Sequence, residues 1–79
     1  MKIKAKFYSE VVRYGGPCPI CGKRVDPKRH WEVSLYSYVL DGKRHYVPVH
    51  DECAGVKKKN KIRGGRVAIH TPDIEIEVE

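Results

Sequence analysis

The sequence predicts a small α+β domain, and three observations lead to this fold class. The chain has 79 residues, too few for two domains that each fold unaided, so we expect one domain over residues 1–79. A β-hairpin pattern lies in the middle, a short helical segment follows it, and alternating strands lie at both ends. Hydrophobic residues make up 41% of the chain, which supports a folded but thin core. A domain of this size usually needs a covalent or metal cross-link.

The hairpin has the clearest local signal. Residues 30–40 are rich in β-branched and aromatic side chains, Asp41-Gly42 is a strong two-residue turn, and residues 43–49 form the return strand. This turn pairs Leu40 with Lys43 and places Tyr36, Tyr38 and His45 on one face. The other face then carries Trp31, Val33, Leu35, Val39 and Tyr46, with Trp31 in the core. Pro48 lacks an N–H group, so we expect it on an edge strand or near a strand end.

A short helix is expected after the hairpin, within residues 50–60. Asp51 and Glu52 suit the N-terminus of a helix, and Lys57 to Lys59 suit its C-terminus, because of the helix dipole. Gly55 weakens this helix, and Gly64-Gly65 prevents its extension.

The two ends of the chain have complementary strand patterns. Lysines alternate with apolar residues from Lys2 to Phe7, and glutamates alternate with apolar residues from Ile74 to Glu79. Side by side, these strands would set a lysine row against a glutamate row and bury both apolar rows. We therefore expect flanking strands over about 2–12 and 66–78 that pair in one sheet, within one chain or between two.

Three cysteines and one histidine have the spacing of a metal site. The chain reads Cys18-Pro-Ile-Cys21 and, 28 residues later, His50-Asp-Glu-Cys53. Zn²⁺ suits this set, because structural zinc takes four tetrahedral nitrogen and sulfur ligands. All four places are filled, so we expect one structural Zn²⁺ held by Cys18, Cys21, His50 and Cys53, and no enzyme activity.

Local features support this assignment. The Cys-Pro-x-Cys-Gly turn has the form of a zinc knuckle, in which Gly22 permits a positive φ. Backbone N–H groups there, with Lys23 and Arg24, can stabilise the thiolate charge. The i, i+3 spacing of His50 and Cys53 places them on one face of a first helical turn. A redox Cys-x-x-Cys pair is the alternative, but it needs a βαβ context. The other histidines, His30, His45 and His70, lack ligand spacing.

The order of knuckle, hairpin and helix resembles the treble-clef zinc finger. The ligand spacing also resembles the poly(ADP-ribose) polymerase-type finger, a Cys3His treble-clef relative that binds DNA breaks. The resemblance covers about residues 17–60 and implies Cys18, Cys21, His50 and Cys53 as zinc ligands with a hairpin between the two pairs. The fold class is thus a zinc-stabilised α+β domain, treble-clef-like, with the terminal strands pairing beside it.

The charge distribution indicates the partner. The formal net charge is +6, and residues 57–66 contain six cations and no acid. The other 69 residues hold ten basic and ten acidic side chains, so all the excess charge lies in this segment. Such a concentration attracts polyanions. We expect a small nucleic-acid-binding or regulatory protein, with DNA favoured over RNA, that contacts phosphates through Lys57, Lys58, Lys59, Lys61, Arg63 and Arg66. Tyr36 and Tyr38 could stack on unpaired bases, but packing against a neighbouring strand is the commoner use of such rings.

Two other functions are compatible with these residues. A protein-interaction module would use the hairpin or a sheet edge, with a protein partner or a second copy. A His-Asn-His nuclease is disfavoured, because His50 is committed to zinc and Asn60 is the only asparagine.

No apolar run approaches membrane-spanning length, and the first residues do not build a signal core, so we expect a cytoplasmic protein. The absence of glutamine, with abundant lysine and glutamate, is a heat-adapted tendency, which fits a thermophile or its virus.

Overall fold

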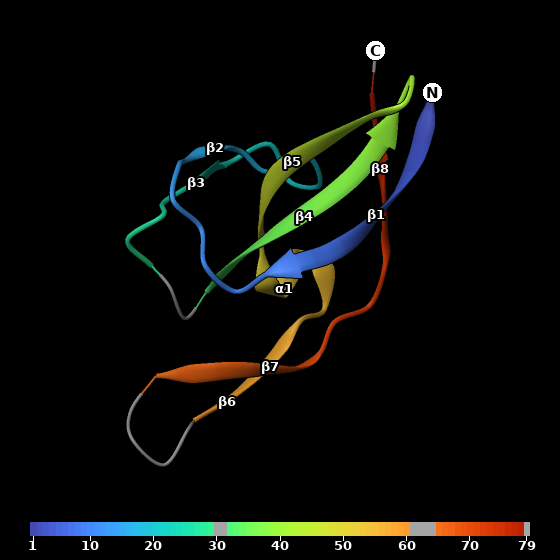
Figure 1. Cartoon of the computed structure of the whole chain (residues 1–79). Coiled ribbons are helices and arrows are strands. Elements are labelled where there is room, and N and C mark those ends of the chain that lie inside the picture. Colours follow the sequence, from blue (N-terminus) through green and yellow to red (C-terminus); the bar gives the residue numbers. More distant parts are fainter. Residues whose placement is uncertain (30–31, 61–64, 79) are drawn as a thin grey trace.

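The computed structural model, which describes residues 1–29, 32–60 and 65–78, is built mostly of strands (Figure 1). Four of them form an antiparallel sheet in the order β5-β4-β1-β8. These are β1 (Lys2–Ser9), β4 (Val33–Leu40), β5 (Lys43–His50) and β8 (Ile74–Glu77). Two ribbons pair β2 (Gly16–Pro17) with β3 (Arg24–Val25) and β6 (Lys57–Asn60) with β7 (Arg66–His70). The single turn of α1 (Asp51–Ala54) follows β5, and no helix in the described ranges is long and apolar enough to span a membrane.

The central hairpin has the register that the sequence predicts. Leu40 pairs with Lys43, and the ladder of β4 and β5 continues to Val33 and His50. Asp41 and Gly42 both have positive φ, 52° and 76°, as a type I′ turn requires. Pro48 lies in β5, an edge strand, where its missing N–H breaks no ladder inside the sheet. Trp31, which the sequence places in the core, lies outside the described residues.

The two ends of the chain pair within the same molecule. Lys2 is opposite Glu77 and Lys4 is opposite Glu75, so the lysine and glutamate rows meet as expected. The N-terminal ammonium also donates a hydrogen bond to the Glu77 Oε1 at 2.8 Å. Figure 1 shows both termini at one end of the sheet.

The C-terminal segment differs from the continuous strand expected over about 66–78. It divides into β7, which pairs with β6, and β8, which pairs with β1. Pro72 lies between them, where its carbonyl accepts a hydrogen bond of 2.7 Å from the Tyr36 hydroxyl. The N-terminal strand is likewise shorter than the expected range and ends at Ser9.

Tyr36 is the largest fully buried side chain in the described part of the protein. Its ring meets that of Phe7 edge to face, with the centroids 5.9 Å apart. Burial, with the nearby Asp51 and Asp73 carboxylates, raises the pKa of Tyr36 to about 12. This ring therefore packs in the core and is not available to stack on a base.

The helix is shorter than expected, and the placement of Lys57 to Lys59 at its C-terminus is wrong. Gly55 adopts a left-handed conformation with φ 80°, and its N–H donates to the Asp51 carbonyl at 2.8 Å. This cap ends the helix after one turn. Val56 is then buried, and the three lysines continue as strand β6.

A buried ion pair explains why the chain turns back into a strand. The Lys58 Nζ lies 2.9 Å from the Asp51 Oδ2, and the Lys58 side chain is only 3% exposed. The same ammonium donates to the Val33 carbonyl at 2.6 Å, and the Ser34 hydroxyl donates to the Asp51 Oδ1 at 2.5 Å. Asp51 therefore joins α1, β4 and β6 through groups that are hydrogen-bonded although buried.

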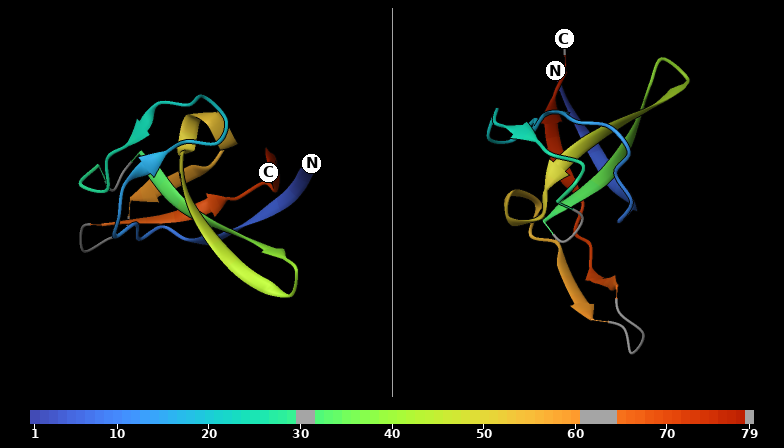
Figure 2. Two further views of the ribbon diagram at one scale, coloured as in Figure 1. Left: turned by 90° about the horizontal axis from the view of Figure 1, so that it is seen from above. Right: turned by 90° about the vertical axis from the view of Figure 1, so that its left-hand side faces the viewer.

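Beyond this contact, β6 and β7 extend away from the four-stranded sheet, as Figures 1 and 2 show. We call this ribbon, residues 57–60 and 66–70, the arm. It contributes to an elongated shape of 41 × 21 × 19 Å.

Removal of the buried ammonium should destabilise the fold. We expect Lys58→Met to lower the free energy of unfolding by about 3–5 kcal/mol, because it leaves the Asp51 carboxylate buried without its counter-charge. Urea unfolding with zinc in excess measures the change. The matched control is Lys57→Met at the exposed neighbouring position, where we expect a change within about 0.5 kcal/mol. Equal stability of the two variants would show that the ion pair does not hold the arm to the sheet.

Candidate metal centre

Cys18 and Cys21 lie in the tight turn that joins β2 to β3. The Cys18 N–H donates to the Lys23 carbonyl at 2.9 Å, and the Gly22 N–H donates to the Cys18 carbonyl at 2.8 Å. Gly22 has φ 78°, so the turn depends on the residue type that tolerates a left-handed backbone. These bonds bring the two thiols to one side of the ribbon.

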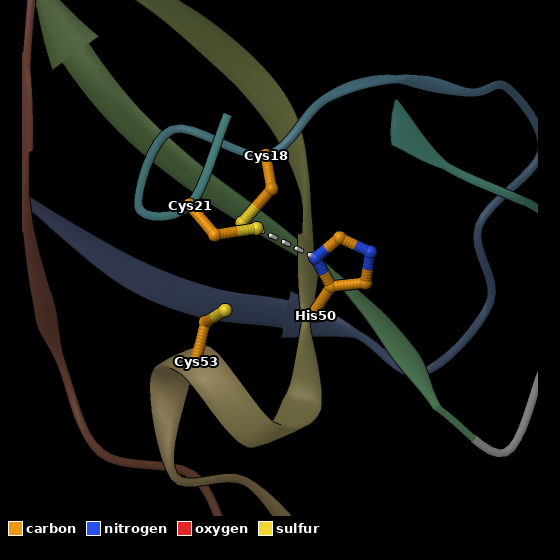
Figure 3. Close-up of side chains that lie close together, drawn as sticks. All are labelled: Cys18, Cys21, His50 and Cys53. Carbon is orange, nitrogen blue, oxygen red and sulfur yellow. Dashed lines mark hydrogen bonds between the residues drawn. The ribbon is translucent and has the colours of Figure 1, made fainter. Parts of the chain in front are cut away.

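His50 and Cys53, at the junction of β5 and α1, face the two thiols of the knuckle. His50 is the last residue of β5 and precedes α1 in an extended conformation, with φ −78° and ψ 135°. Cys53 follows within the single helical turn. The change from strand to helix between these two residues directs both side chains to the knuckle (Figure 3).

The four donor atoms form one cluster. The three cysteine sulfurs and one imidazole nitrogen all lie within 4.8 Å of one another. The Cys21 Sγ and the His50 Nδ1 are 3.3 Å apart. Ligand atoms of a tetrahedral zinc site with ordinary bond lengths are about 3.5–3.8 Å apart. Cys18, Cys21, His50 and Cys53 are thus close enough to hold one metal ion.

The electrostatics of the thiols favour a bound cation. Burial opposes the ionisation of Cys18, but hydrogen bonds from three backbone amides and the His50 ring outweigh it and lower its pKa to about 6. The amides are those of Ile20, Cys21 and His50. Burial, which penalises the charged thiolate, and then the neighbouring Cys18 and Cys21 raise the pKa of Cys53 to about 12. A divalent cation would offset both effects and allow all three thiols to ionise.

The other histidines do not join this cluster. His45 stacks on Tyr38, with ring centroids 5.2 Å apart, and His70 is exposed in β7. His30 lies outside the described residues. Across residues 1–29, 32–60 and 65–78, no second group of three or more metal-binding side chains comes together.

The three described lysines of the basic segment lie in two different environments. Lys57 and Lys59 are exposed on β6, whereas Lys58 is buried against Asp51. Lys58 is therefore not part of an exposed phosphate-binding surface, in contrast to the prediction. Arg66 begins β7, and Lys61 and Arg63 lie outside the described residues.

Tyr36 and Tyr38 pack in the sheet, which is the commoner use of such rings, and other tyrosines are the exposed ones. Tyr36 is buried and Tyr38 is half-buried, whereas Tyr8 and Tyr46 are 51% and 42% exposed. A signal for this arrangement exists in the alternation, because Tyr8 continues the solvent-facing phase of Lys2, Lys4 and Lys6. In the return strand, Tyr46 is three residues before the buried Val49, so the two side chains lie on opposite faces of the sheet.

No protein-family model matches this chain, and no curated protein or solved structure is significantly similar to it. The metal centre is therefore defined by the spacing and convergence of its own four donor side chains.

Loss of a ligand should remove both the metal and the fold. We expect purified protein to contain one divalent ion per chain, and Cys53→Ser to lose it and melt at a lower temperature. Elemental analysis and thermal melting with and without a chelator measure both effects. His70→Ala, at an exposed histidine away from the cluster, is the control and should keep metal and melting temperature. A chelator that leaves the wild-type melting curve unchanged would contradict a structural metal.

Proposed function

We propose that this protein is a zinc-stabilised nucleic-acid-binding module that contacts phosphates through its arm. The observation that carries this proposal is the exposure of Lys57 and Lys59 on a ribbon that extends from the sheet, within a segment that holds the whole excess charge. DNA is the first polyanion to test, because the ligand spacing resembles that of a finger that binds DNA breaks.

Zinc is the metal that fits the donor set best. Three thiolates and one imidazole are soft and borderline ligands that suit tetrahedral Zn²⁺. Four protein ligands leave no place for an activated water, so we propose a structural role and no catalytic activity. The knuckle, the hairpin and the single helical turn that carry the ligands support a treble-clef-like arrangement of residues 17–60.

Zinc would allow the arm to be presented in one orientation. His50 and Cys53 flank Asp51, whose carboxylate pairs with Lys58 at the base of the arm. A metal that fixes the turn between β5 and α1 therefore also fixes the ion pair to which β6 is attached. The exposed lysines then lie on a preorganised ribbon, which lowers the entropic cost of binding.

A protein-interaction module is the alternative function. Val67 and Ile69 on β7 are 36% and 62% exposed, so the arm also offers apolar side chains to a partner. The salt dependence of binding separates the two functions, because phosphate contacts release counterions and apolar contacts do not.

Neutralising the arm should weaken nucleic-acid binding and its dependence on salt. We expect the double variant Lys57→Ala and Lys59→Ala, which retains Lys58, to bind duplex DNA more weakly. Each phosphate contact that is lost should reduce the slope of log K against log salt concentration by about 1. Fluorescence anisotropy over a series of salt concentrations measures both quantities.

The matched control removes the same charge elsewhere. Lys28 and Lys43 are exposed and lie outside the arm, so their double alanine variant has the same net charge. If both variants lose the same affinity, binding follows net charge and not the arm. If neither variant changes the affinity for DNA, the phosphate contacts do not lie on the arm.

A further inference from the structure

The sheet leaves part of one face uncovered. Leu35 and Pro48, at one end of the β4–β5 hairpin, are buried on this face. Gly16 of β2 lies against Pro48, so the knuckle ribbon covers that end. Toward the hairpin turn the same face is open, and Val39 and Tyr46 are 57% and 42% exposed.

Two tyrosines meet on this open face. The rings of Tyr8 and Tyr46 have centroids 4.8 Å apart and meet at 66°, although they come from strands β1 and β5. Tyr8 and Tyr46 are 51% and 42% exposed, so each ring retains an open surface. We call Tyr8, Tyr46 and Val39 the tyrosine face.

A bulge in β1 brings these two rings together. The pairing of β1 with β4 shifts between Phe7 and Ser9, which leaves Tyr8 as the extra residue. Such a bulge turns a side chain away from the regular ladder. Tyr8 therefore reaches Tyr46 across β4.

Cations border the tyrosine face. Lys6 pairs with Ser37, and Ser37 pairs with Tyr46, so these three residues form one row across the sheet. Arg44 is opposite Val39 at the turn end. Lys6 and Arg44 form no ion pair within the described ranges, whereas Lys2 and Lys4 have glutamates opposite them.

We propose that the tyrosine face binds single-stranded nucleic acid, with unpaired bases stacked on the tyrosines and phosphates beside Lys6 and Arg44. This inference rests on the proposed function and adds the strand state of the ligand. Base–aromatic stacking needs bases that are not stacked in a duplex, and cations beside the rings suit the backbone of such a strand. A purely apolar partner would leave Lys6 and Arg44 unpaired.

The test compares three polyanions: a labelled oligothymidylate single strand, a DNA duplex of equal length and heparin. We expect Tyr8→Leu and Tyr46→Leu each to weaken single-strand binding roughly 5- to 100-fold, since leucine keeps apolar packing but removes the flat ring. Tyr46→Phe should bind the single strand like the wild type, and heparin affinity should stay the same in all three variants. Zinc content and melting temperature verify that each variant is folded.

A charge-matched pair of variants tests the phosphate contacts. Arg44 and Lys43 are neighbours at the hairpin turn, both exposed, and their side chains lie on opposite faces. Arg44→Ala should weaken single-strand binding, whereas Lys43→Ala should not. Equal losses in the two variants would overturn the assignment of the strand to this face.

The remaining outcomes separate this inference from the proposed function. If the leucine variants keep full single-strand affinity while neutralising the arm weakens DNA binding, the arm proposal stands and this inference fails. If the wild type binds none of the three probes, both fail. If the leucine variants only abolish self-association in sedimentation analysis, the face is a contact between copies of the chain, and the inference is overturned.

Discussion

The convergence of four metal-binding side chains is the constraint on which the rest of the structure depends. The knuckle ribbon has only two residues in each strand, and α1 has one turn, so neither element is stable by itself. The core around them consists mainly of valines and small residues. A bond network through one ion would join the ribbon, the end of β5 and the helix into a single unit.

Asp51 transmits this constraint to the arm. Its backbone N–H donates to the Glu32 carbonyl, and its own carbonyl accepts from Gly55 and Val56. Its carboxylate meanwhile binds Ser34 and Lys58. A buried ion pair contributes little net stability compared with apolar packing, but it demands one geometry. This residue therefore defines where β6 begins and in which direction it leaves the sheet.

Local signals in the sequence were sufficient for the hairpin, the ligands and the pairing of the two chain ends, although not for the bounds of the terminal strands. Asp41-Gly42 fixes a two-residue turn, and the turn fixes every pair from Leu40 and Lys43 onward. The Cys-x-x-Cys and His-x-x-Cys spacings likewise identify the four donors without knowledge of the fold. Gly55 is a local signal for the end of the helix, but the strand that follows was not predictable in this way, because Lys58 pairs with an aspartate on another element. The bulge at Tyr8 has no signature in the residues around it, so its contact with Tyr46 emerged only from the structure.

Three consecutive lysines thus occupy two chemically different environments. The first and third ammonium groups lie in water, and the second is enclosed beside Asp51. Reagents that acylate amines would modify these positions at very different rates, although the sequence makes them look equivalent. In related sequences, substitutions at positions 57 and 59 would be tolerated as long as some positive charge remained nearby. Position 58 would change only together with position 51.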